Sequence, residues 1–355
     1  MASRRILVVA CLNFITIGIL SAVIGPVLPT LAHQTGSALS ELGALISALF
    51  VGALIAQITG GPLNDHLGSR PLLLVGLGLT SVGVAGIALS PALPLTLACG
   101  VLAGIGHGSI DLGTGVLVAV IHAEKSVFAL NLINVFFGIG AALGPAAVSL
   151  ALLWWHNPLL ALWLSGALAA LLIPAVAALA LPPPIARAHS ASTPRARLYR
   201  APVLWMLAGV VLLYVGLENG IGGWIAVYVQ RTTTLSLAQG ALIASMFWLA
   251  LTVGRLLATA FGTRVTPRAL LLYSLAAALA GTLALATSAG QAAFTVAAVA
   301  LIGLGFGPVF PTTLAITTAT FSANPGRAAG VTQTAGSAGG ILIPWLQGIV
   351  LFRIG

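Results

Sequence analysis

The chain has 355 residues, of which 14 are basic and 5 acidic, and 59% are hydrophobic. A soluble domain carries about a quarter charged residues, so this composition excludes an ordinary water-soluble globular protein. The formal charge of +9 does not indicate nucleic-acid binding, because most basic residues fall between apolar runs and form no stripe. Cys11 and Cys99 both lie inside apolar runs, so no disulfide framework is expected.

Apolar runs long enough to cross a bilayer follow one another along the chain. Six are expected in the first half, near residues 6–31, 41–60, 72–90, 94–120, 127–152 and 158–181. Five more are expected near residues 202–229, 237–260, 269–288, 291–320 and 328–352. The sequence therefore predicts an all-α membrane protein with an N-terminal six-helix bundle (1–181), a linker (182–201) and a C-terminal bundle with five visible helices (202–355).

The basic residues predict the orientation of these spans. Eleven of them fall on the side of the N-terminus and the linker, whereas the opposite side keeps Arg231 and Arg353, and Arg255 lies near the end of a span. Cytoplasmic loops of membrane proteins carry the excess of Lys and Arg, so the N-terminus and the linker are expected in the cytoplasm. The alanine and arginine richness, with a single lysine, hints at a GC-rich bacterium and hence at an inner membrane.

The two halves of the chain match. A polar segment at 61–71, GPLNDHLGSRP, has a weaker copy at 259–268, about 198 residues later. The glycine triplet within 104–108 likewise aligns with the triplet within 303–307. A loop that recurs between equivalent spans predicts a duplicated helical bundle, which is the plan of a transporter. A six-plus-six repeat needs a twelfth helix, so we expect a chain truncated before it, unless one span hides two helices.

Five residues of the polar segment resemble the signature between helices 2 and 3 of major facilitator transporters: Gly61, Leu63, Asp65, Gly68 and Arg70. The resemblance extends over the whole chain and implies two pseudo-symmetric six-helix bundles related by an axis along the membrane normal. It also implies that Gly61, Asp65, Gly68 and Arg70 form a cytoplasmic gate, in which Asp65 caps a neighbouring helix and pairs with a cation. The weaker copy lacks the acid, so a latch is expected in one half only.

Within that superfamily, the chain most resembles the fucose–proton symporter branch of sugar porters. The resemblance is carried by four segments, at 106–111, 131–138, 214–228 and 307–312. It assigns proton coupling to the acid at Asp111 and sugar binding to Asn131. The further acid that this branch has in helix 1 has no counterpart, and Asn13 is the main polar residue there.

Asp111 is the strongest candidate for chemistry on its own residues. It is a carboxylate within an apolar span, where a charge costs about 2.5–3.5 kcal/mol. Burial disfavours the charged form, which suits a group that loads and releases protons. His107 lies four residues earlier on the same helical face, so the two are predicted to form a proton relay. A hydrogen bond between packed helices is the alternative.

Glu218 is the second intramembrane acid, and it is a candidate for both proton coupling and substrate binding. With Asn219 it begins a glycine-rich stretch at 220–223 that is expected to break the helix. Trp224 and Tyr228 follow at a spacing of four. An acid, an amide and aromatic rings on one face suit a polyol. An aromatic anchor at the outer membrane interface is the alternative.

Further candidate substrate ligands are Asn13, Asn131, Asn134, Phe310 and Gln333, which lie on spans that can approach a central cavity. Interhelical packing is the alternative for each of them. The sequence shows no zinc-type spacing of Cys and His and no serine–base constellation. No metal, no cofactor and no enzymatic activity are therefore predicted.

The leading interpretation is a monomeric, proton-coupled symporter for a sugar or similar small polar solute, working by alternating access in a lipid bilayer. The alternative is a proton-driven drug exporter, because residues 140–145 partly resemble the helix 5 signature of antiporters. Ala147 and Val148 stand where that signature has a glycine pair. A membrane sensor without transport activity, or a nonfunctional fragment, is the third interpretation.

Overall fold

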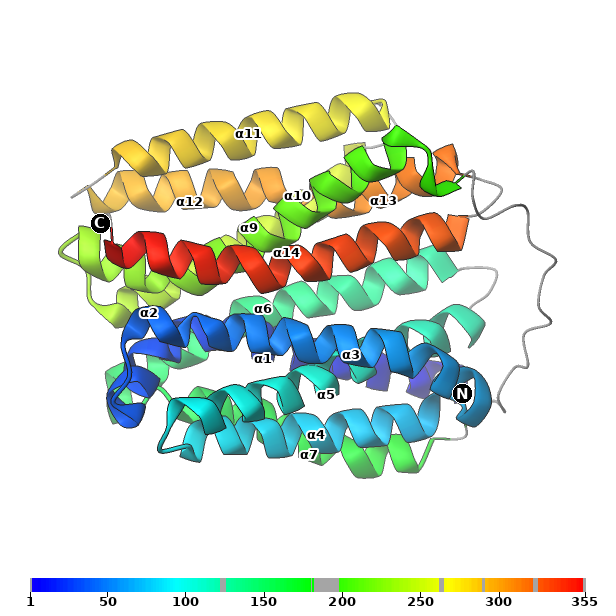
Figure 1. Cartoon of the computed structure of the whole chain (residues 1–355), viewed down its shortest axis with the longest axis horizontal. Coiled ribbons are helices and arrows are strands. Elements are labelled where there is room, and N and C mark those ends of the chain that lie inside the picture. The colour runs from blue at the N-terminus through cyan, green and yellow to red at the C-terminus, as the bar shows by residue number, and fades with distance from the viewer. Residues whose placement is uncertain are drawn as a thin grey trace. The chain divides into compact units, whose positions relative to one another are not determined.

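The computed structural model describes residues 2–121, 126–179, 181, 198–261, 265–288, 291–321 and 325–353, and the regular structure in these ranges is α-helical (Figure 1). Within them, eleven helical spans are long and apolar enough to cross a membrane, as the sequence predicts. The chain divides into two compact units, Met1–Ala188 and His189–Gly355. Most of the expected linker, residues 182–197, lies outside the described residues.

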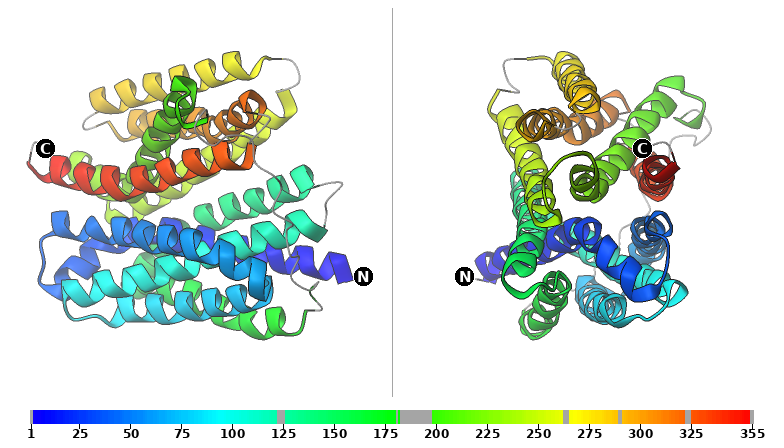
Figure 2. Two further views of the ribbon diagram at one scale, coloured as in Figure 1. Left: turned by 45° about the vertical axis from the view of Figure 1, so that its right-hand side comes forward. Right: turned by 90° about the vertical axis from the view of Figure 1, so that its left-hand side faces the viewer.

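The helices described in the first unit form six spans: α1 (Ala2–Thr35), α2 (Leu39–Leu42), α3 (Ala44–Leu67), α4 (Ser69–Leu89), α5 (Leu93–Ile121), α6 (Ser126–Trp155) and α7 (Leu160–Ala177). α1 packs along α6, and α5 contacts both α3 and α4 (Figure 2). α7 lies against α4 and α1.

The helices described in the second unit form five spans: α9 (Pro202–Thr232), α10 (Leu237–Phe261), α11 (Pro267–Thr287), α12 (Ala292–Phe306), α13 (Val309–Thr320) and α14 (Pro325–Arg353). α9 packs along α14, and α12 contacts both α10 and α11. This is the neighbour pattern of α1 with α6 and of α5 with α3 and α4. The predicted duplication is therefore present in the packing.

The aligned glycine triplets show the duplication at the level of single residues. In the triplet within 104–108, the first and third glycines lie against the backbone of α3, and the second lies against α4. In the triplet within 303–307, the first and third lie against α10, and the second lies against α11. A Cβ at any of these positions would meet the neighbouring helix. The small residues thus let the same helices approach in both units.

The predicted loop between the second and third spans is mostly helical. α3 continues through the polar segment to Leu67, and α4 begins at Ser69. The turn is made at Gly68, which has a φ of 80°. A side chain is strained in that conformation, whereas glycine adopts it freely. Gly68 therefore reverses the chain at a single residue.

One further expectation about helix continuity is wrong, and one expected span, although present as Ala292–Thr317, is divided within its length. The stretch at 220–223 does not break its helix, because α9 is continuous from Pro202 to Thr232. The expected span 291–320 consists instead of two helices, since α12 ends at Phe306 and α13 begins at Val309. Pro308 has no N–H, and its ring clashes with the carbonyl four residues earlier, so it ends the helix there.

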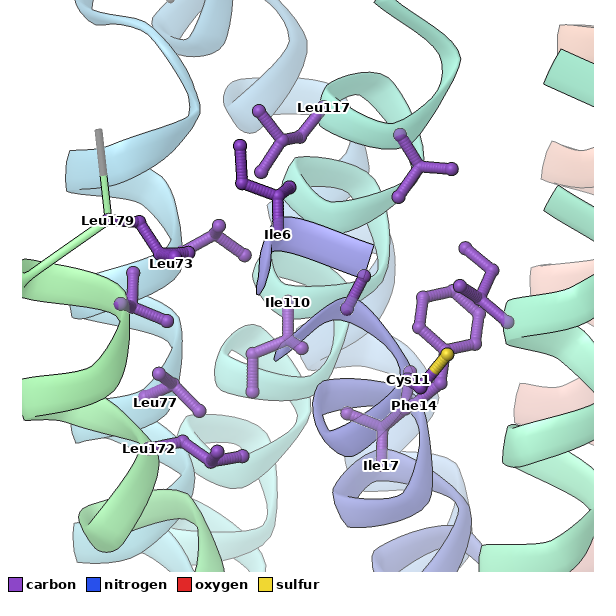
Figure 3. Packing of buried hydrophobic residues seen from close by; sticks show 14 of the residues in the cluster. Ile6, Cys11, Phe14, Ile17, Leu73, Leu77, Ile110, Leu117, Leu172 and Leu179 are labelled. Atoms are coloured by element: carbon purple, nitrogen blue, oxygen red, sulfur yellow. The ribbon is translucent and has the colours of Figure 1, made fainter. Parts of the chain in front are cut away.

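The core of the first unit joins α1, α4, α5, α6 and α7. Figure 3 shows Phe14 and Ile17 of α1 packed with Leu77 of α4, Ile110 of α5 and Leu172 of α7, each at most 4% exposed. This apolar cluster fixes the face that α5 turns toward α1. It thereby sets the position of the polar residues that follow on α5.

Candidate functional site

A polar stripe runs along α5 where it meets α1. His107, Asp111 and Thr114 stand at positions i, i+4 and i+7, which share one helical face. Thr114 Oγ1 accepts a 3.1 Å hydrogen bond from Asn13 Nδ2, and His107 Nε2 lies 3.1 Å from Ser21 Oγ. Asn13 and Ser21 both belong to α1. Two interhelical bonds therefore tie α1 to α5, one on each side of Asp111.

The Ser21 hydroxyl indicates which nitrogen of His107 carries the proton. Ser21 Oγ donates to the carbonyl oxygen of Ile17 at 2.8 Å. Its oxygen therefore accepts from the imidazole, and Nε2 is the donor. In the neutral ring Nδ1 is then an acceptor. His107 can take up a proton at Nδ1 without giving up its bond to α1.

Asp111 lines an open pocket of about 300 Å³ formed by α1, α5 and α6. Apart from Asp111 and Asn134, the lining consists of apolar residues and glycine, among them Phe14, Leu130 and Ile133. Within the described part of the chain, no side chain forms an ion pair or hydrogen bond with Asp111. Such surroundings disfavour an isolated carboxylate. The pocket thus presents a carboxyl group suited to binding a proton.

The structure brings one predicted sugar ligand to Asp111. Asn134 lines the same pocket, and its amide donates to the Leu130 carbonyl oxygen at 2.9 Å. Asn13 is 1% exposed, and its Oδ1 is a buried acceptor that has no hydrogen-bond partner among the residues that the structure describes. The side chain of Asn131, on α6, lies outside what the structure describes.

The second unit holds a cluster of a different kind. Glu218 of α9 forms an ion pair with Arg255 of α10, with Nη2 3.3 Å from Oε1. Tyr214 donates its hydroxyl proton to the same oxygen at 2.7 Å and lies 3.4 Å from Arg255 Nη2. Its ring contacts Phe306 and Phe310 at centroid distances of 5.5 and 6.3 Å. The charged pair therefore lies beside the break between α12 and α13.

Arg255 is not among the predicted site residues, although two signals in the sequence point to it. A charged residue inside a membrane span is costly and is almost always paired. Glu218 is the only acidic residue after Glu124, so it is the only acidic side chain in the second half available to balance such a charge. Charge balance alone could have predicted the ion pair.

The other predicted ligands of the second unit make different contacts. Asn219, Trp224 and Tyr228 each donate to a backbone carbonyl oxygen, at 2.9, 2.8 and 3.2 Å. Trp224 is buried, since its indole packs between α9 and α14. Phe310 is half-buried beside Tyr214, and Gln333 is exposed on α14. Of this group, the structure brings only Phe310 to the charged pair.

The residues predicted to form a gate lie where α3 meets α4. The side-chain surroundings of Gly61 and Asp65, in the last turns of α3, lie outside what the structure describes. Arg70, in the first turn of α4, donates to the carbonyl oxygen of Leu179, just beyond α7. A cation at the C-terminal end of a helix is favourable. Arg70 thus ties α4 to the end of α7, and a latch through Asp65 stays a prediction.

Comparison with known proteins gives one family over nearly the whole chain. The family model described as the Major Facilitator Superfamily matches residues 7–344. The cyanate transport protein CynX of Escherichia coli (strain K12) is 27% identical over 340 residues, which cover 92% of this chain and 85% of that protein. Sodium-dependent glucose transporter 1 of Homo sapiens is 28% identical over 143 residues, covering 40% of this chain and 27% of that protein.

The fold has a solved counterpart. The crystal structure of a D-xylose–proton symporter matches with a TM-score of 0.83 at 16% identity, over 99% of this chain and 90% of that one. The chain spans 35%, 56% and 31% of the length of the first three curated relatives that it matches. At 16% identity the likeness concerns the fold.

Proposed function

Because the chain belongs to the major facilitator superfamily, we propose that it is a secondary transporter that moves a sugar or similar small polar solute together with a proton. The predicted all-α major facilitator fold is confirmed, and the chain is a multi-pass membrane protein. The superfamily and the relatives above are transporters and not enzymes, which agrees with the sequence-based prediction.

One observation carries the coupling part of the proposal. Asp111 is a carboxyl group inside a membrane span, in an apolar pocket, without an opposite charge among the described residues. Its neutral form is favoured there, because an isolated buried carboxylate is costly. A group that is neutral in dry surroundings and ionised in wet ones binds and releases protons as those surroundings alternate. His107, one turn earlier, offers Nδ1 as a second proton acceptor.

The proposal places coupling at Asp111 and not at Glu218. The Arg255 cation and the Tyr214 hydroxyl both stabilise the ionised form of Glu218. Burial opposes these two contacts, and a proton cycle at Glu218 would have to disturb both of them, which a proton cycle at Asp111 does not require. Protonation of Asp111 would then shift the balance between outward-open and inward-open states, and the substrate shifts it through a difference in affinity.

The substrate ligands stay predictions. Amide side chains both donate to and accept from hydroxyl groups, which favours Asn13, Asn131 and Asn134 as ligands of a sugar. In the second unit, Asn219, Trp224 and Tyr228 would have to leave their backbone carbonyl partners in order to reach a substrate. We keep these three, Phe310 and Gln333 as candidates, and Gly61, Asp65, Gly68 and Arg70 as the proposed cytoplasmic gate.

The finer assignments rest on sequence. Placement in the fucose–proton symporter branch depends on four short segments, and a relative named as a glucose transporter supports a sugar. The distribution of basic residues supports a cytoplasmic N-terminus and linker. We propose a monomer in a bacterial inner membrane.

The proposal is tested by measuring the pH inside proteoliposomes that carry the full chain, at zero membrane potential. Neutral sugars are added outside, once with and once without Na⁺, because one relative is named as sodium-dependent. We expect one sugar to acidify the interior in both buffers. Asp111→Asn should abolish the response, and Asp111→Glu should retain part of it.

Acidification that needs Na⁺ would contradict proton coupling. Silence from a folded protein with every neutral sugar would contradict symport of a neutral sugar, and silence with sugar acids as well would make drug efflux the next function to test.

A further inference from the structure

The ion pair of Arg255 and Glu218 needs a reason other than stability. Removing two charges from water is expensive, and their mutual attraction repays that cost only with excellent geometry. Apolar residues of similar size often stabilise the same space equally well. A lone pair of charges within membrane helices is by default a functional feature.

Glu218 is held more closely by Tyr214 than by Arg255. The Tyr214 hydroxyl holds Glu218 Oε1 at 2.7 Å, the length of a strong O–H···O⁻ bond. Arg255 Nη2 is 3.3 Å from that oxygen and 3.4 Å from the Tyr214 oxygen, which exceeds the roughly 2.7–2.9 Å of a charge-assisted N–H···O⁻ bond. The Arg255 side chain is 19% exposed and that of Glu218 is 9% exposed. The guanidinium is therefore the looser and more accessible partner.

Charge balance limits what can replace Glu218. It is the only acidic residue of the second unit. Arginine keeps its charge in proteins, so separating the guanidinium from Glu218 takes away the one acidic side chain of its own unit and costs free energy. An anion from outside the chain removes that penalty. The planar fork of arginine fits a carboxylate better than any other small anion apart from phosphate-like groups.

The setting also suits a polyol skeleton. Phe310, which is half-buried beside Tyr214, offers a ring against which C–H groups can pack, whereas Phe306 is buried between Tyr214 and Phe247. They stand on either side of the break between α12 and α13. Irregular backbone at membrane depth is tolerated where it is buried in protein or lines a cavity.

We propose that Arg255 recognises a carboxylate on the substrate, and that Glu218 occupies this position as a place-holder when the substrate is absent. The substrate class is then a sugar acid, an aldonate or a uronate. This inference rests on the proposed function, because it specifies the substrate class of the same transporter.

If Glu218 is a place-holder, removing its charge should strengthen the binding of the substrate. Glu218→Gln removes the competing charge but keeps an oxygen that can accept from Tyr214. A sugar acid should then bind more tightly, on the order of tenfold, because the site is no longer occupied. A direct ligand role for Glu218, or a purely structural one, predicts weaker or unchanged binding.

The experiment is titration calorimetry on the purified full chain with matched pairs of ligands. D-galacturonate is compared with D-galactose, and D-glucuronate and D-gluconate are compared with D-glucose. The proteins are the wild type, Glu218→Gln, Arg255→Lys and the double variant Glu218→Gln/Arg255→Gln. The double variant removes both charges and so leaves none uncompensated. Thermal unfolding confirms that each protein is folded.

We expect one acid to bind the wild type more tightly than its neutral parent. Glu218→Gln should strengthen that binding, Arg255→Lys should weaken it about tenfold because the fork is lost, and the double variant should abolish it. Equal binding of acid and parent, no acid binding to either the wild type or Glu218→Gln, or weaker binding to Glu218→Gln each overturns the inference.

The proteoliposome assay separates this inference from the proposed function. Proton movement with a neutral sugar, without binding of any acid, overturns the carboxylate site and leaves sugar symport standing. Binding of an acid without proton movement by any substrate leaves the site standing and overturns symport.

Discussion

The same pair of spans carries opposite chemistry in the two units. In the first unit, α5 turns His107 and Asp111 toward α1, and the imidazole bonds to α1 through Ser21. About 199 residues later the matching positions are Phe306 and Phe310, whose rings contact the ring of Tyr214 on α9. The acid of the second unit has moved to α9 and has gained a cation on α10. Duplication thus preserves which helices pack, while the polar groups diverge.

The backbones of the two units also differ next to these matching positions. α5 is continuous through residues 108–109, whereas the matching residues, Gly307 and Pro308, separate α12 from α13. The first unit therefore pairs an intact helix with an acid that has no charged partner in the part of the chain that the structure describes. The second pairs a broken helix with an acid held by a cation. We interpret the first as the proton site and the second as the site of a charged ligand.

The largest expected effect tests this division directly. Asp111→Asn should lower substrate-driven proton uptake by about 100-fold or more, since a positioned proton-transfer group contributes on this order. Glu218→Gln should retain proton uptake. Both are measured with an internal pH probe in proteoliposomes. Equal losses of proton uptake in Asp111→Asn and Glu218→Gln would contradict the division into a proton site and a ligand site.

Folding stability should depend more on the ion pair of Glu218 and Arg255 than on Asp111, which is the opposite of what is expected for proton uptake. Arg255→Gln leaves Glu218 without its cation and should destabilise the protein by about 3–5 kcal/mol, whereas removing both charges with Glu218→Gln/Arg255→Gln should restore most of it. Asp111→Asn breaks no ion pair and should change stability little. Thermal unfolding in detergent measures all three. A large loss in Asp111→Asn would reveal a partner for that carboxyl.

A moderate effect is expected at His107. His107→Gln removes the second proton acceptor and should slow proton uptake about tenfold, which corresponds to about 1.4 kcal/mol in the barrier. Ser21→Ala is the matched control, because it removes the interhelical bond and keeps the imidazole. If Ser21→Ala is as slow as His107→Gln, the bond to α1 matters and the proton acceptor does not.

The smallest effect concerns the bond between Asn13 and Thr114. Interhelical hydrogen bonds in membrane proteins average about 0.6 kcal/mol in double-mutant cycles. A cycle of Asn13→Ala and Thr114→Ala, followed by unfolding in detergent, should give a coupling energy near that value. A coupling energy of zero would mean that this bond does not hold α1 to α5.

The spans and the repeat were predictable because their signals are local. Apolar length defines a span, and the glycine triplets gave the alignment that packing later confirmed. The break at Pro308 was not predictable in this way, since Pro26, Pro145 and Pro344 all lie inside continuous helices. Whether a proline ends a helix depends on what neighbouring helices offer to the freed backbone groups.

The candidate site was predictable only in part. Asp111 and Glu218 stand out as acids in apolar spans, which requires no knowledge of the fold. Their surroundings depend on the register between helices far apart in sequence, as with Asn13 and Thr114 or Glu218 and Arg255. No local pattern encodes that register.

The proposal that Asp111, and not Glu218, binds the proton is tested most directly by infrared spectroscopy. The absorption of protonated carboxyl groups is measured in the purified protein near neutral pH. Comparison of the wild type with Asp111→Asn and Glu218→Gln assigns the band to a residue. We expect a protonated carboxyl band that disappears in Asp111→Asn and persists in Glu218→Gln. A band that disappears in Glu218→Gln and persists in Asp111→Asn would contradict it.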